Sequence, residues 1–140
     1  MTAGYSGTPL PRKLGIKPGQ RITFLDAPPA FAETLGELPE GVAQPRTTLR
    51  GGRLDVIVAF FVERRGLEQR LPSLIAALQP AGALWIAWPK RASRVTTDLT
   101  EDVVRELGLA AGVVDVKVCA IDATWSGLKL VIRLRDRPPV

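Results

Sequence analysis

The chain has 140 residues, of which 46% are hydrophobic and 24% charged, a balance that suits one folded domain and argues against wholesale disorder. Its formal net charge of +5 supports solubility and a weak attraction to polyanions, but does not establish nucleic-acid binding. The sequence contains no histidine and one cysteine, Cys119, which excludes an internal disulfide, a zinc site of clustered Cys and His, and catalysis by a histidine base.

Two segments bear on the location of the protein. The longest apolar run, residues 54–62, contains Asp55 and is far shorter than the ~20 residues that a membrane-spanning helix needs. Residues 1–15 contain no hydrophobic stretch resembling a secretion signal. We therefore expect a cytoplasmic protein without a membrane partner.

The first part of the chain predicts short elements separated by turns. Residues 1–16 form an N-terminal arm punctuated by Gly and Pro, with a short helix over 9–14. After a turn at 17–20, the next predicted elements are a strand over 21–25, a short helix from Ala30 that ends at Gly36 or Pro39, and a weak strand over 46–49.

The middle of the chain predicts buried strands joined by a helix. The run "LDVIVAFFV", residues 54–62, is apolar without strict alternation, as expected of a strand covered on both faces. Leucines at 67, 71, 74 and 78, with Ile75, have helical spacing. Pro72 either kinks that helix or begins its main part, residues 79–82 end it, and "ALWIAW" at 83–88 is the next strand.

The last third predicts one more helix and a hairpin. Asp98 is placed to cap the helix with Glu101 as its reciprocal partner, and Gly108 is placed to end it. Residues 113–121 and 127–134 predict two strands joined through Ser126 and Gly127, and residues 135–140 predict a frayed tail.

This order of elements predicts an α/β fold over residues 1–140 as a single domain. Strands that alternate with helices favour a mainly parallel sheet with right-handed crossovers. We expect a Rossmann-like sheet of about six strands with helices on both faces and a C-terminal antiparallel hairpin.

Residues 54–134 resemble the second half of a class I methyltransferase domain. "LDVIVAFFV", a Leu-rich helix and "LQPAGAL" at 78–84 follow the family's pattern of a strand, a helix and a "L-K-P-G-G-x-L" turn, with Ala81 in place of one glycine. The resemblance implies the family's α/β fold.

The first half departs from that family where its cofactor would bind. The family places a Gly-rich loop after its first strand to admit S-adenosylmethionine, whereas this chain has "LDAPPAF" there, with two prolines and no glycine. The acid that would bind the ribose hydroxyls after the second strand is missing from "RTTLRGGR". We therefore expect no cofactor and no metal, and assign no catalytic residue.

A second resemblance covers nearly the whole chain. The strings "GYSGTPL", "KLGIKPGQ", "LWIAWPK", "TDLTEDVVRE", "KVCAID" and "TWSGLK" resemble a family of short bacterial proteins of unknown function. That family implies no activity, so the residues themselves must indicate the function.

Polar and aromatic residues follow the predicted strand ends. Ligands of open α/β sheets bind outside the carboxyl ends of the strands, so these residues predict a ligand or partner surface at that edge. Its candidate residues are Tyr5, Asp26, Arg64, Trp88, Lys90, Arg91, Arg94, Asp122, Thr124 and Trp125. Tyr5, on the N-terminal arm, would act from a lid.

The basic loop at 90–94 has two interpretations. Lys90, Arg91 and Arg94 bind an anionic group beside the helix that follows, or they pair with the acids of the helix region 98–106.

Three functions remain open from the sequence. We favour a non-catalytic binding or regulatory module whose partner is a protein or an anionic small molecule. The alternative is an enzyme acting on an anionic small molecule at the sheet edge, with Lys90, Asp122 and Tyr5 as its polar groups. Nucleic-acid binding through Arg46, Arg50, Arg53 and the 90–94 loop ranks lowest, because the sequence lacks interleaved aromatics and any nucleic-acid motif.

Overall fold

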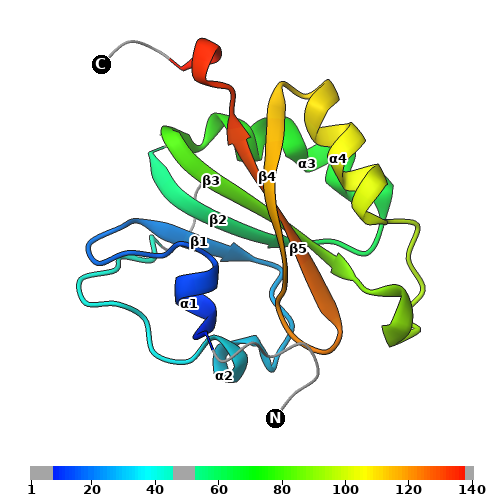
Figure 1. The fold of residues 1–140 in the computed structure, drawn as a ribbon, viewed down its shortest axis with the longest axis horizontal. Coiled ribbons are helices and arrows are strands. Elements are labelled where there is room, and N and C mark those ends of the chain that lie inside the picture. Colours follow the sequence, from blue (N-terminus) through cyan, green and yellow to red (C-terminus); the bar gives the residue numbers. More distant parts are fainter. Residues whose placement is uncertain (1–7, 46–52, 138–140) are drawn as a thin grey trace.

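A computed structural model describes residues 8–45 and 53–137, and Figure 1 shows its elements around one sheet. The strands are β1 (Ile22–Leu25), β2 (Leu54–Phe60), β3 (Leu78–Pro89), β4 (Val113–Ala120) and β5 (Trp125–Ile132). The α-helices are α1 (Leu10–Lys13), α2 (Phe31–Leu35), α3 (Arg64–Ala76) and α4 (Glu101–Ala110), with short 3-10 turns η1 (Arg91–Ser93) and η2 (Leu134–Asp136).

The sheet has the order β1-β2-β3-β5-β4. Strands β1, β2 and β3 are parallel, β5 is antiparallel to β3, and β4 is antiparallel to β5. Strand β4 therefore runs in the same direction as the first three. The expected parallel strands and terminal hairpin are confirmed, with five strands in the described residues. The weak strand predicted over 46–49 lies outside them.

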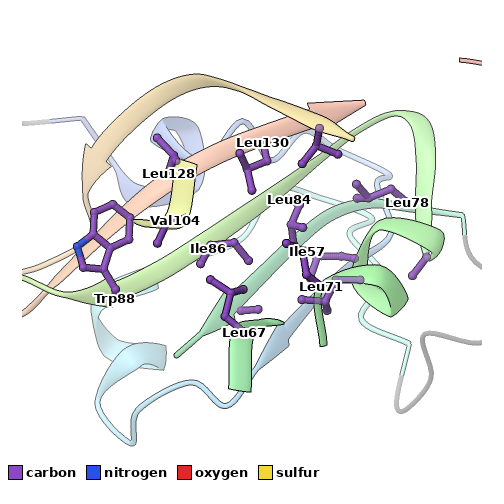
Figure 2. Packing of buried hydrophobic residues seen from close by; sticks show 14 of the residues in the cluster. Ile57, Leu67, Leu71, Leu78, Leu84, Ile86, Trp88, Val104, Leu128 and Leu130 are labelled. Carbon is purple, nitrogen blue, oxygen red and sulfur yellow. The ribbon is translucent and has the colours of Figure 1, made fainter. Parts of the chain in front are cut away.

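One face of the sheet is covered by the two longer helices, which Figure 1 shows together on one side. The predicted leucine stripe of α3 is buried at Leu67, Leu71 and Leu74, because helical spacing directs these three side chains to the same side. Figure 2 shows Leu67 and Leu71 against Ile57 and Ile86 of the sheet. Leu74 and Val104 of α4 belong to the same cluster. This cluster contains large side chains that each contribute about 1.5–3 kcal/mol on burial.

The opposite face is covered by α1, α2 and the segments that connect them. Leu10 and Leu14 from the first segment and Phe31 from α2 pack with alternate residues of β2. The buried indole N–H of Trp85 donates to the Leu14 carbonyl at 3.0 Å, which ties the N-terminal segment to the centre of the sheet.

Helix α3 differs from the prediction at Pro72 and at its C-terminal end. It continues from Arg64 to Ala76 with the exposed Pro72 inside it, because buried leucines before and after the proline hold the helix on the sheet. Residues 79–82 do not end the helix but belong to β3, which begins at Leu78. The pairing of β2 with β3 is irregular there, so the Pro-Gly segment forms a bulge rather than a helix stop.

Helix α4 also differs at both ends. Its cap is Thr100, whose hydroxyl accepts the Val103 N–H at 3.2 Å, and not Asp98. Gly108 lies within the helix, which ends at Ala110; its missing side chain lets Leu130 of the sheet approach closely. Near this helix end the glycine with positive φ is Gly112, two residues beyond Ala110.

The C-terminal hairpin and tail complete the described fold. Strand β5 begins at Trp125, two residues before the predicted start, and pairs with both β3 and β4. Residues 135 and 136 of the predicted frayed tail belong to η2 instead. No helix in the described ranges is long and apolar enough to span a membrane.

Candidate functional site

Several predicted site residues lie at one edge of the sheet. The carboxyl ends of β1, β2, β3 and β4 share this edge with the start of β5. Asp26 follows β1, Arg64 begins the helix after β2, Lys90 follows β3, and Trp125 begins β5. Tyr5 lies outside the described residues, as do Arg46 and Arg50.

The turn between β4 and β5 holds the basic loop in place. The Asp122 carboxylate accepts the N–H groups of Thr124 and Trp125, each at 2.8 Å. The Thr124 carbonyl in turn accepts the Lys90 N–H at 2.7 Å. Asp122 and Thr124 therefore shape the turn and anchor the loop. The sequence pattern, which placed both on a ligand surface, did not indicate this structural role.

An open cavity of about 430 Å³ lies beside this loop, between the end of β3 and the start of α4. We call it the Lys90 hollow. Its lining includes Lys90, Arg91, Thr97, Thr100, Glu101 and Ser126. The three hydroxyl residues were not among the predicted site residues. The hydroxyl-rich stretch from Thr96 to Thr100 is the sequence signal that points to Thr97 and Thr100, whereas Ser126 reaches the hollow from β5.

The acids of the neighbouring helix do not pair with the basic loop. Within the described ranges, no ion pair involves Lys90, Arg91 or Arg94. Arg105 instead forms ion pairs with the nearby acids. The nitrogen–oxygen distances are 2.5 Å to Glu101, 2.9 Å to Asp102 and 2.9 Å to Asp115 of β4.

The Asp98 carboxylate forms a hydrogen bond with a backbone N–H group. Its carboxylate accepts the N–H of Arg64, the first residue of α3, at 2.6 Å. The acid expected to cap α4 thus stabilises the start of a different helix, where a negative charge is favourable. Of the two interpretations of the basic loop, pairing with the helix region 98–106 is absent from the described structure.

Arg64 and Arg94 do not line the Lys90 hollow. The Arg64 guanidinium pairs with Glu68 at 2.7 Å, one turn along α3, and this hydrogen bond raises the pKa of the already basic guanidinium. Arg94 is exposed and has a φ of 63°, a left-handed conformation that ends η1 and reverses the chain.

A second open cavity, of about 440 Å³, lies at the ends of β1 and β2. We call it the Trp125 hollow. Its lining includes Asp26, Phe60, Phe61, Glu63, Arg65 and Trp125. The Phe60 and Trp125 rings meet edge to face with centroids 5.1 Å apart, so one wall is held by aromatic packing.

The two tryptophans of the predicted surface face opposite sides of the sheet. Trp88 is only 5% exposed and packs in the cluster beneath α3 and α4, as Figure 2 shows. Trp125 is half-buried and packs against the cluster on the other face. The predicted residues thus share an edge but divide between two hollows, because side chains alternate along each strand.

The loop after β1 keeps the features that set it apart from the methyltransferase pattern. Asp26 adopts a φ of 55°, and two prolines precede a helix of five residues, Phe31–Leu35. Ala30, the residue before that helix, provides no side-chain cap. A proline nitrogen has no hydrogen to donate, so this loop offers few backbone donors to a ligand.

Known structures share this fold. A SAM-dependent methyltransferase from Aquifex aeolicus matches with a TM-score of 0.60 and 15% identity over 87% of each chain. The Methanococcus jannaschii fibrillarin pre-rRNA processing protein matches with a TM-score of 0.52 and 16% identity, over 89% of this chain and 69% of that one. The Burkholderia thailandensis 1,6-didemethyltoxoflavin-N1-methyltransferase matches with a TM-score of 0.55 and 16% identity, over 86% and 73%.

These matches confirm a methyltransferase-like α/β fold and, at such low identity, the fold alone. No protein-family model matches the sequence, and no curated protein is detectably similar to it. The resemblance to short bacterial proteins therefore stays a prediction.

Proposed function

We propose that the chain is a cytoplasmic, non-catalytic binding domain that takes a small anionic molecule in the Lys90 hollow. One observation carries the proposal: Lys90 and Arg91 line a cavity while no acid in the described ranges pairs with either. Among the described residues, the one acid that lines the same hollow, Glu101, pairs with Arg105 instead. Lys90 and Arg91 repel each other, and an anion between them would relieve that repulsion.

The composition of the hollow suits a phosphate or carboxylate. A guanidinium presents a planar fork of donors and an ammonium a compact charge, and together they match a multivalent oxyanion. The loop that carries them is anchored through Thr124, so less conformational entropy would be lost on binding than from a free loop.

The loop after β1 supports a ligand other than S-adenosylmethionine. A proline-containing segment without glycine leaves neither the room nor the backbone donors that the family's Gly-rich loop supplies. The bonds of Asp122 to the turn also weigh against its use as a catalytic carboxylate, since those bonds occupy one of its oxygens.

The test is calorimetric titration with inorganic phosphate at low ionic strength. We expect binding by the unaltered protein and a loss of at least tenfold in affinity in the double variant Lys90→Ala, Arg91→Ala. The matched control is Lys17→Ala, Arg70→Ala, which removes the same charge from exposed positions that line neither the Lys90 hollow nor the Trp125 hollow.

An equal loss in both double variants would overturn the proposal, because the effect would then come from net charge and not from the hollow. Absence of phosphate binding by the unaltered protein would also overturn it.

A further inference from the structure

The Lys90 hollow and the Trp125 hollow are neighbours. Trp125 pairs with Pro89 in the sheet and Ser126 pairs with Trp88, so adjacent residues of β5 line different hollows. The Thr97 hydroxyl, on the Lys90 side, donates to the carbonyl of Val62, on the Trp125 side, at 2.5 Å. One molecule could therefore reach both hollows by crossing the chain that separates them.

The Trp125 hollow has the opposite electrostatic character. It combines aromatic rings with the carboxylates of Asp26 and Glu63, and among the described residues Arg65 is the one cation in its lining. In the described part of the chain, neither carboxylate joins an ion pair or accepts a hydrogen bond. Such a surface favours a flat apolar group that carries N–H donors and disfavours a second anion.

We propose that the two hollows form one bipartite site for a phosphate monoester of an amino-substituted aromatic compound. The phosphate lies in the Lys90 hollow, and the aromatic body with its amino group lies in the Trp125 hollow. This inference rests on the proposed function and extends it by naming the chemical class of the ligand. Each hollow lies within the size range of small-molecule sites, and a ligand confined to one would leave the other empty.

The probes are adenosine 5′-monophosphate, ribose 5-phosphate, which lacks the aromatic group, and adenosine, which lacks the phosphate. We expect the monophosphate to bind at least tenfold more tightly than either part by calorimetry. A molecule that occupies both hollows gains the interactions of both, but loses its translational and rotational entropy only once.

Two sets of variants separate the halves of the site. The double variant Asp26→Asn, Glu63→Gln should lower the affinity for the monophosphate about tenfold and leave the affinity for ribose 5-phosphate unchanged. Asn tolerates the left-handed conformation of residue 26, so this variant should fold. The double variant Lys90→Ala, Arg91→Ala should lower the affinity for both phosphate esters. The matched control, Glu33→Gln with Glu40→Gln, removes two exposed carboxylates outside both hollows and should change neither.

The outcomes distinguish this inference from the function on which it rests. The bipartite site is wrong, and the anion site stands, if the monophosphate binds no more tightly than ribose 5-phosphate. The same conclusion follows if the Asp26 and Glu63 substitutions leave the affinity for the monophosphate unchanged. If neither phosphate ester binds, both are wrong.

Discussion

Gly82 illustrates a single residue whose smallness the sheet requires. A side-chain carbon built on it would lie 2.8 Å from the carbonyl oxygen of Leu54 and 3.0 Å from that of Gln79. Both neighbours are backbone atoms of paired strands, which cannot rotate away as a side chain could. Gly82 thus permits the close approach of β2 and β3 at the irregularity in their register.

We predict opposite effects from two Gly→Ala substitutions. Gly82→Ala should lower the free energy of unfolding by about 1–3 kcal/mol, because the new methyl group must displace backbone. Gly66→Ala, at an open helical position where the nearest atom is 3.8 Å away, should raise it by about 0.5–1 kcal/mol. Urea unfolding measures both, and a stable Gly82→Ala variant would contradict the argued contact.

Arg105 connects two consecutive elements, α4 and β4. It reaches Glu101 and Asp102 on its own helix and Asp115 on the strand. The hydrogen bond from Arg105, which outweighs the effect of burial, holds the pKa of Asp115 below its ordinary value. The charged form of Asp115 therefore favours the folded state.

This shift predicts a pH dependence with a definite sign. Asp115 contributes its full stabilisation above the ordinary aspartate pKa of about 3.9, and the contribution is lost as the pH falls through its lower folded value. We expect Asp115→Asn to be less stable than the unaltered protein at pH 6, and the difference to shrink below about pH 4. Urea unfolding at several pH values measures it, and a difference independent of pH would contradict the assignment.

At the scale of the whole molecule, the missing histidine sets the response to pH. Histidine is the side chain whose ordinary pKa lies between pH 5 and 8, and this chain has none. Burial is the main cause that raises the pKa of the Cys119 thiol, with Lys13 and Lys117 opposing it, so the thiol does not titrate near neutrality either. Neither histidine nor this thiol therefore changes the net charge around pH 7.

The free energy of unfolding should consequently vary little between pH 6 and 7.5. Linkage of one proton would change it by about 1.4 kcal/mol per pH unit, and we expect a far smaller slope. Urea midpoints across this range provide the measurement. A slope near one proton would indicate a strongly shifted carboxyl or amino group in the folded chain.

Local patterns were sufficient for much of the fold. The apolar run at 54–62 predicted a buried strand, which the structure has over Leu54–Phe60, and the leucine stripe of α3 predicted an amphipathic helix. Both patterns depend only on neighbouring residues. The two apolar runs predicted the hairpin, but Ser126 and Gly127, which we expected to join its strands, lie inside β5, and the chain turns at residues 121–124 instead. The gathering of residues at one sheet edge also followed from strand direction alone.

The sequence by itself determined the class of fold and the exclusion of histidine chemistry, because composition and period are local properties. Only the tertiary structure decided that Asp98 stabilises α3 rather than α4, and that Gly108 makes room for Leu130. It also decided that Trp88 and Trp125 face opposite sides of the sheet. Such outcomes depend on which distant segments meet, and no spacing within one segment specifies them.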